Sequence, residues 1–254
     1  MHETYMAKRK KEMKKAPKRM MQDVVRLSYN MSGKMTNVLS LSTNVNKNTR
    51  CMHRHNSCPT SICANCFAIK TVNHYDRLHI NLNYNTDNLI NRKLTLNETR
   101  DIAIEILYAL EKNETHKFRF ESFGDLNNTI QAWNYLAIVS DLAILAENHN
   151  YYIECALWTK NIDYLVKAFD EFDEILKGYI RSVLNVLISS TFIGLPIGQG
   201  LIDKTEKRLG MPIGVFTVEK EENEKTNCGA RNCTKCGKCY KKFAATTYLW
   251  EVLK

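Results

Sequence analysis

The sequence contains little glycine and proline, ten and four residues among 254. This scarcity, together with 44% hydrophobic and 25% charged residues, excludes collagen-like, low-complexity and largely disordered chains. No uninterrupted run of about 18 apolar residues is present, so we expect no membrane-spanning helix. The N-terminus lacks the apolar stretch of roughly 7–15 residues that a secretory signal needs. We therefore expect a cytoplasmic globular protein of one large domain or two small ones.

The positive charge of the chain is concentrated at its N-terminus. Residues 1–50 hold 12 basic and 3 acidic residues, whereas residues 51–254 hold 24 of each, so the whole net charge of +9 lies in the first fifty. We assign residues 1–34 as a basic N-terminal arm, which could bind the phosphate backbone of a nucleic acid through charge. A solvated helix is the alternative, because no aromatic side chains alternate with these charges. The densest charges are Lys8, Arg9, Lys10, Lys11, Lys14, Lys15, Lys18 and Arg19.

Cysteine is the most informative residue type in this sequence. Eight of the nine cysteines form two groups, and each group contains the spacing C-x4-C-x2-C. Reduced cytosolic thiols make disulfides a poor explanation, while two-residue spacers let thiolates converge on one metal centre. The remaining residue, Cys155, is expected to pack inside the sheet. The predicted ligands are Cys51, Cys58, Cys63 and Cys66 in the first group and Cys228, Cys233, Cys236 and Cys239 in the second.

The metal itself is open at this stage. The crowded C-x2-C-x2-C at residues 233–239 favours a [4Fe–4S] cluster, one per group, over structural zinc, which usually uses two separated pairs. Zinc in one or both groups remains the alternative. Cys51 is the weakest ligand because its spacer is longer, and His53 or His55 could replace a thiolate in the first group.

The rest of the chain alternates between predicted strands and helices. Strand–helix–strand repetition predicts parallel strands joined by right-handed crossovers, and we assign residues 35–222 as an α/β partial (β/α) barrel. Residues 223–254 form a separate C-terminal metal-binding segment. The predicted strands cover 38–43, 118–123, 151–158, 183–188 and 213–218; the predicted helices cover 64–84, 97–112, 128–147, 162–177 and a short stretch after the glycines of 194–200.

Polar, chemically active residues follow most of these strands. In parallel sheets and barrels, sites form at the carboxyl ends of the strands, so we expect these residues and both cysteine groups to share one functional edge. The candidate catalytic residues are Glu121, Asp125 and Lys160; the candidate cofactor-binding residues are Gly124, Asp125, Ser189 and Ser190.

Each of these side chains also has a purely structural interpretation. Glu121 could be a paired core carboxylate, and Arg119 could pair with it on the same strand face. Asp125 could cap a helix, and Lys160 could be an exposed loop cation. Ser189 and Ser190 could satisfy local backbone groups.

Four short motifs, in this order, resemble the phage and plasmid "gene product 88" family. They are Leu41-Ser42-Thr43 with the first cysteine group, residues 118–125 (FRFESFGD), residues 156–161 (ALWTKN), and the second cysteine group beginning at Asn227. The resemblance covers about residues 35–242 and leaves the basic arm outside. It implies a phage or plasmid origin and little about activity, because the family is poorly characterised.

A more distant similarity is to radical S-adenosylmethionine enzymes. These have a partial (β/α) barrel with a three-cysteine loop after the first strand, which holds a [4Fe–4S] cluster. The resemblance implies that Cys58, Cys63 and Cys66 hold such a cluster, that Gly124-Asp125 contacts the amino end of S-adenosylmethionine, and that Ser189 and Ser190 lie near its ribose. The spacing C-x4-C-x2-C differs from the usual C-x3-C-x2-C, and Cys51 could close the open iron site.

Three functions therefore remain open. The first is an iron–sulfur enzyme with a radical-enzyme-like barrel, acting on nucleic acid or a small metabolite. The second is a metal-stabilised nucleic-acid-binding protein without catalysis. The third is an electron carrier or redox sensor. Substrate, reaction and oligomeric state do not follow from the sequence.

Overall fold

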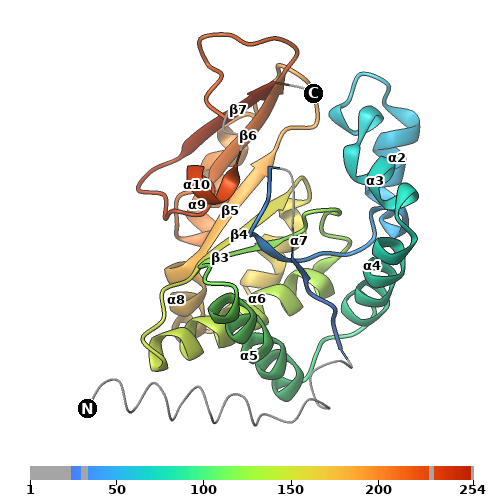
Figure 1. Ribbon diagram of the computed structural model, residues 1–254. Helices are drawn as coiled ribbons and strands as arrows, with labels where there is room; N and C mark the ends of the chain where they lie inside the picture. The colour runs from blue at the N-terminus through green and yellow to red at the C-terminus, as the bar shows by residue number, and fades with distance from the viewer. Residues whose placement is uncertain (1–23, 30–33, 229–231, 253–254) are drawn as a thin grey trace.

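The computed structural model describes residues 24–29, 34–228 and 232–252 (Figure 1). Its centre is one seven-stranded sheet in the order β1-β2-β3-β4-β5-β6-β7. β1 pairs antiparallel with β2, and all later neighbours pair in parallel. The predicted α/β class with parallel strands is confirmed, whereas a barrel remains a prediction. The strands are β1 Ser28–Tyr29, β2 Leu39–Leu41, β3 Lys117–Phe120, β4 Glu154–Thr159, β5 Leu184–Ser189, β6 Gly214–Glu219 and β7 Thr247–Val252.

Helices connect the consecutive parallel strands up to β6. The long connection between β2 and β3 carries two 3-10 turns, η1 Val45–Lys47 and η2 Ile62–Asn65, and four helices. Figure 1 shows α2, α3 and α4 stacked beside the sheet as a separate column. The helices are α2 Thr49–Ser57, α3 Phe67–His74, α4 Asp76–Leu89, α5 Leu96–Lys112, α6 Thr129–Asn148, α7 Ile162–Phe169, α8 Glu174–Val183, α9 Gln199–Leu209 and the short α10 Cys233–Cys236.

One face of the sheet packs against the helices. Alternate residues of each strand point to this face, as the period of two requires. Phe118 and Phe120 of β3 and Cys155 and Leu157 of β4 are fully or almost fully buried in the same apolar cluster as the inner side of α6. Cys155 therefore packs inside the sheet, as predicted. The confined position also explains why burial strongly raises the pKa of its thiol.

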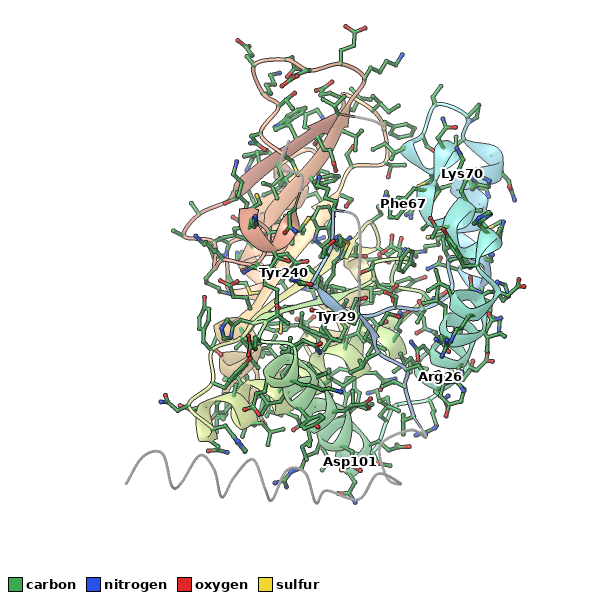
Figure 2. All side chains as sticks on the ribbon, in the orientation of Figure 1. Arg26, Tyr29, Phe67, Lys70, Asp101 and Tyr240 are labelled. Atoms are coloured by element: carbon green, nitrogen blue, oxygen red, sulfur yellow. The ribbon has the colours of Figure 1, made fainter. Side chains whose placement is uncertain are left out.

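The opposite face of the sheet is covered by the C-terminal segment. Trp158, Leu187 and Phe216 on the sheet pack in one apolar cluster with Tyr240 and Phe243. Tyr240 is labelled in Figure 2, where it lies over the sheet. Strand β7 of the same segment pairs with β6 in parallel over its full length. The C-terminal segment thus completes the sheet as well as covering it.

Helix α6 is the central helix of the helical layer. It is long and apolar enough to cross a membrane by length and composition, but 67% of its most apolar window is buried inside the fold. A core helix passes the same test. Within the described residues, α6 is the one helix with this property.

Two predicted helices are broken in the structure. Residues 64–84 form η2, α3 and the start of α4, with the break at Tyr75, whose φ of −121° is extended. The predicted helix 162–177 ends at Phe169, and α8 starts anew where the Asp173 side chain accepts a hydrogen bond from the Leu176 backbone N–H at 2.9 Å. Helix α2 and strands β1 and β7 were not predicted. The predicted basic arm lies mostly outside the described residues, with 1–23 and 30–33 beyond them.

Candidate functional site

The carboxyl ends of β2 to β5 bring the predicted site residues to one edge of the sheet. Thr43 follows β2, and Glu121 and Asp125 follow β3. Thr159 ends β4 and precedes Lys160. Because neighbouring parallel strands end side by side, segments separated by dozens of residues meet here.

Glu121 turns away from the face that strand alternation predicts for it. Its backbone has a φ of 57°, in the left-handed region, and its carboxylate points into the helical layer. There it accepts hydrogen bonds from the Tyr135 hydroxyl at 2.5 Å, Gln131 Nε2 at 2.5 Å and the Thr43 hydroxyl at 2.9 Å. The side chain is buried, and burial raises the pKa of Glu121 to about 8, although the hydrogen bonds from Tyr135 and Thr43 lower it. Glu121 is therefore held entirely by protein groups.

The predicted ion pair between Arg119 and Glu121 is wrong. Because the Glu121 carboxylate has turned to α6, Arg119 reaches only the Glu121 backbone oxygen, at 3.5 Å. Its guanidinium carbon instead lies 4.4 Å from the centre of the Trp158 ring, in a cation–π arrangement. Arg119 and Trp158 thus form a pair on the sheet face that the C-terminal segment covers.

Gly124 is confined by the same network. A Cβ atom at this position would lie 2.3 Å from Glu121 Oε2 and 2.8 Å from the Thr43 backbone oxygen. Only a residue without a side chain allows the β3 loop to approach β2 this closely. Gly124 therefore has a packing role, whatever else it contacts.

Asp125 joins the loop after β3 to the end of β4. Its Oδ1 accepts a hydrogen bond from the Thr159 hydroxyl at 2.5 Å, and its Oδ2 accepts one from the Lys160 backbone N–H at 3.0 Å. The Leu126 backbone N–H also donates to Oδ1, at 2.8 Å. On the side of α2, Arg54 Nη1 lies 3.8 Å from Oδ2. Asp125 is thus a fixed negative charge between β4 and α2.

The charge of Lys160 acts on the first cysteine group. This positive charge, with that of Arg54, lowers the pKa values of the Cys51 and Cys63 thiols, while burial raises both and dominates. Asp125 acts in the opposite direction on Cys51. Among the described residues, the Lys160 ammonium group makes no hydrogen bond or ion pair. It is therefore a cation available beside two thiols.

The first cysteine group is spread over α2, η2 and the start of α3. Cys51 is buried in α2, where the Asn48 side chain caps its backbone N–H at 3.0 Å. Cys63 is buried in η2, and the charge of Cys66 contributes to its raised pKa. Cys58 ends α2 and is only partly buried. The loop thus brings three of its four thiols into electrostatic contact, because Cys51 also responds to Cys63.

The histidines beside this group have different positions. His55 Nδ1 lies 2.8 Å from the Cys63 backbone oxygen, so it braces the loop. His53 lies on the outer side of α2, where it lines a shallow hollow with Thr49, Arg50 and Arg54.

The second cysteine group lies on the covered face of the sheet. Cys233 begins α10, and its backbone N–H donates to the Lys34 backbone oxygen at 2.7 Å. Asn185 of β5 donates to the backbone oxygens of Cys239 at 3.2 Å and Tyr240 at 2.6 Å. Burial raises the pKa of the Cys239 thiol to about 12, and the charges of Cys228, Cys233 and Cys236 raise it further. All four thiols therefore share one environment.

Both groups have the donor chemistry for a thiolate-ligated metal centre, and soft thiolates suit zinc and iron–sulfur clusters. Within the described residues, however, no three His, Cys, Asp or Glu side chains are gathered tightly enough to form a ready metal site. Metal binding would have to draw the sulfur atoms together. The second group fits such a centre better, because Cys228, Cys233 and Cys239 pack against one apolar cluster.

The first cysteine loop reaches the apolar cluster of the second group through Ile62, whereas Cys51 and Cys66 pack in another cluster with Ile69 and Val72. Ile62, between Cys58 and Cys63, packs against the same cluster as Cys228, Cys233 and Cys239 from the second group. Trp158 also packs there. That both groups lie on one side of the sheet stays a prediction.

Ser189 ends β5 and Ser190 follows it at the same edge. The Ser190 hydroxyl donates to the Phe192 backbone oxygen at 3.0 Å and also to that of Leu195. The Ser190 hydroxyl therefore hydrogen-bonds nearby backbone groups, which was the structural alternative for this residue. The Thr191 backbone oxygen accepts a hydrogen bond from the Ile62 backbone N–H at 2.9 Å, which joins this loop to the first cysteine loop.

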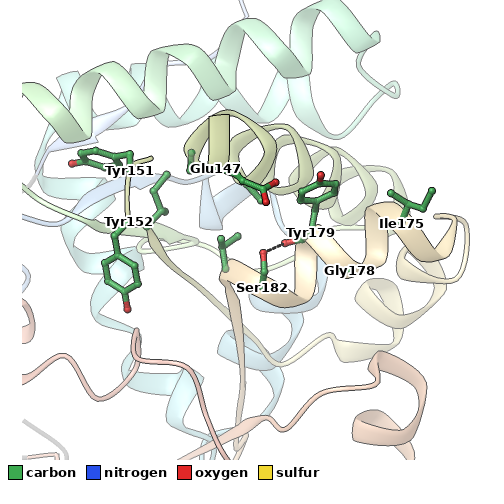
Figure 3. A pocket seen from close by; sticks show the side chains of 11 residues that line it. Glu147, Tyr151, Tyr152, Ile175, Gly178, Tyr179 and Ser182 are labelled. Carbon is green, nitrogen blue, oxygen red and sulfur yellow. Dashed lines mark hydrogen bonds between the residues drawn. The ribbon is translucent and has the colours of Figure 1, made fainter. Parts of the chain in front are cut away.

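A separate groove lies at the other end of the sheet, between α6 and α8 (Figure 3). Tyr151, Tyr152, Tyr179 and Glu147 line it, and Ser182 donates to the Tyr179 backbone oxygen at 2.7 Å. No predicted site residue lines this groove.

Sequence reasoning missed the partners that fix the site. Gln131 and Tyr135 lie on one turn of α6 and hold Glu121, and Arg54 on α2 approaches Asp125. The signal available in the sequence was that Gln131 and Tyr135 are four residues apart, a spacing that places both side chains on one face of a helix. No family model matches this chain, and neither does any curated protein or solved structure that was compared with it.

Proposed function

We propose that this protein is an iron–sulfur enzyme with a radical-enzyme-like α/β fold. The observation that carries the proposal is the position of Asp125 and Lys160 at the carboxyl edge of the sheet, beside α2, which carries Cys51 and approaches Asp125 through Arg54. A cysteine loop after the first parallel strand, at the edge where charged residues follow the next two strands, is the arrangement that the resemblance to radical S-adenosylmethionine enzymes implies.

The residues divide between holding the centre and holding a ligand. Cys58, Cys63 and Cys66 would hold the first [4Fe–4S] cluster, with Cys51 as a fourth thiolate or a neighbour. Such a cluster supplies one-electron chemistry when bound. Lys160 would bind an anionic group of the substrate or of S-adenosylmethionine, and Asp125 keeps the Lys160 backbone in place. Glu121, Gly124, Ser189 and Ser190 would shape this edge.

Metal analysis tests the proposal directly. The protein is purified without oxygen, and iron, acid-labile sulfide and zinc are measured per chain with the visible absorption spectrum. About eight iron and eight sulfide would support two cubane clusters. A colourless protein with about two zinc per chain would contradict it and leave a structural metal protein.

A Cys51→Ser variant then separates catalysis from other roles. A cluster with one open iron keeps its iron and sulfide without Cys51, whereas a four-thiolate cluster loses them. Cys155→Ala is the matched control, because Cys155 is buried in the sheet, outside both groups. Loss of the first cluster in Cys51→Ser, with Cys155→Ala unchanged, would count against the enzyme and favour an electron carrier or redox sensor. S-adenosylmethionine cleavage is assayed on the variant that retains iron.

Nucleic-acid binding is the second candidate, favoured by the charge of residues 1–34. The metal centres would then be structural, with zinc or iron–sulfur in each group. Affinity for DNA or RNA should fall steeply with salt and disappear when residues 1–22 are removed. Binding that survives this removal would show that the arm is not the main contact.

We also propose membership of the "gene product 88" family, a phage or plasmid origin and a cytoplasmic location. Hydrogen bonds join three of the four motifs that carry the resemblance, the first to the second and the second to the third. Thr43 comes from the first motif, Glu121 and Asp125 from the second, and Thr159 and Lys160 from the third. Motifs that meet in space support a shared function more strongly than motifs that are only close in composition.

A further inference from the structure

Lys34 contacts a thiol of the second cysteine group. Its Nζ lies 3.4 Å from Cys228 Sγ, as a hydrogen-bond donor. The same ammonium group forms an ion pair with Glu251 of β7. Lys34 precedes β2, so this contact joins two segments 194 positions apart in sequence. Both charged side chains are largely buried, with 27% of Lys34 and 23% of Glu251 exposed.

Arg119 approaches the same group from the sheet. Its guanidinium carbon lies 4.4 Å from the centre of the Trp158 ring. Trp158 packs in the same apolar cluster as Cys228, Cys233 and Cys239. The second cysteine group is thus flanked by two cations, one from the segment before β2 and one from β3.

Four thiolates on a metal centre carry more negative charge than the metal neutralises, for zinc and for a [4Fe–4S] cluster alike, and the four thiols of this group are partly buried. Burying such a charge among apolar side chains is unfavourable unless cations or hydrogen-bond donors compensate it. Lysine and arginine side chains that contact sulfur supply both. Partners of this kind outside the ligand set commonly change metal affinity by about 10–100-fold.

We propose that Lys34 and Arg119 are the counter-cations of a metal centre held by Cys228, Cys233, Cys236 and Cys239. Glu251 limits the effect of Lys34, since it shares the same ammonium group. This inference rests on the proposed metal binding and adds which residues set the affinity of the second centre.

The test compares metal retention in two variants that break the same ion pair from opposite sides. Lys34→Gln removes the cation, and Glu251→Gln removes its competitor. The full-length protein is dialysed against a fixed excess of a chelator, and the retained metal is measured. Cys233→Ser defines how much metal belongs to the second centre. Lys235→Gln is the matched control, because Lys235 lies in α10 between two of the cysteines but is exposed.

We expect Lys34→Gln to hold the second metal about tenfold more weakly. Glu251→Gln should hold it as tightly as the unaltered protein or more tightly, and Lys235→Gln should be unchanged. Arg119→Gln should weaken binding and Arg119→Lys should restore part of it. An ion pair that served only packing would give the same loss in Lys34→Gln and Glu251→Gln.

Two other results would overturn the inference in different ways. If Cys233→Ser loses metal but Lys34→Gln and Arg119→Gln both retain it fully, the second centre exists and the counter-cation role is wrong. If Cys233→Ser retains as much metal as the unaltered protein, the second centre itself is absent, and that part of the proposed function falls with the inference. Far-ultraviolet circular dichroism of each variant confirms that it is folded.

Discussion

Gly124 and Glu121 lie so close together that a methyl group on Gly124 would come within 2.3 Å of Glu121 Oε2. The Thr43 backbone oxygen lies 2.8 Å from the same position, so the methyl group cannot move away from Glu121 in that direction. A Gly124→Ala substitution should therefore lower the free energy of unfolding by about 1–3 kcal/mol, as overpacking of a dense core does.

The matched control for this prediction is Gly198→Ala. Nothing lies within 4 Å of a Cβ atom at Gly198, and its φ of −62° suits any residue. The free energy of unfolding of Gly198→Ala, measured by urea unfolding, should differ from that of the unaltered protein by no more than about 0.5 kcal/mol. Equal effects of the two substitutions would show that the contact with Glu121 does not confine Gly124.

The buried Glu121 carboxyl should make stability depend on pH. Its pKa is raised to about 8 in the folded protein, whereas an unfolded chain has its ordinary value of about 4.3. The folded state therefore binds more protons between these values. The stabilisation of the folded state that comes from the raised pKa of Glu121 is fully present below about pH 4. It is lost as pH rises toward 8, and the free energy of unfolding falls by up to about 1.4 kcal/mol per pH unit.

Glu121→Gln keeps the shape of the side chain and removes the titration. Urea unfolding of both proteins at a series of pH values should show a flatter profile for the variant between about pH 4.5 and 8. Parallel profiles would mean that Glu121 is ionised in the folded protein.

The hydrogen bond between the Thr159 hydroxyl and Asp125 should stabilise the junction of β3 and β4. Thr159→Val keeps the side-chain volume but leaves a buried carboxylate oxygen with one partner fewer, at a cost of about 1–3 kcal/mol. Thr159→Ser retains the hydroxyl and should lose less. If both variants unfold at the same urea concentration, the hydroxyl is not the stabilising group.

Asn185 should hold the C-terminal segment on the sheet. Its side-chain amide donates to three successive backbone oxygens, those of Cys239, Tyr240 and Lys241. Asn185→Asp replaces this donor with a carboxylate facing carbonyl oxygens, so it should be more damaging than Asn185→Ala. A thiol reagent should then modify the cysteines of the second group faster in both variants than in the exposed control Asn148→Ala. Unchanged rates of thiol modification would mean that the packing of Tyr240 and Phe243, and not Asn185, keeps the C-terminal segment on the sheet.

The sequence predicted most of the parallel part of the sheet because helices follow each of the strands β2 to β5. The alternation in residues 118–123 and the helical pattern of residues 97–112 were sufficient to find β3 and α5. Breaks inside helices were harder to predict, since the N-cap at Asp173 lies within a continuous helical pattern. Strand β7 was not predicted, although residues 247–252 also alternate, because no long helix separates it from β6.

The candidate site was predicted in its residues but not in its contacts. Strand order indicated that Asp125 and Lys160 would meet at one edge, and they do. The left-handed backbone at Glu121 was not predictable from local sequence, because it depends on Gln131 and Tyr135 reaching from α6. The charges that flank the second cysteine group come from Lys34 and Arg119, which no spacing rule connects to residues 228–239.

The place of the C-terminal segment has a consequence for synthesis of the chain. Residues 24–219 can emerge from the ribosome and begin to fold before Asn227 appears, but β6 then has a free edge, and Trp158 and Phe216 are uncovered. The nascent protein therefore carries an unpaired sheet edge and an exposed aromatic surface until residues 227–252 are synthesised. Chaperones that bind apolar surface would act during this interval.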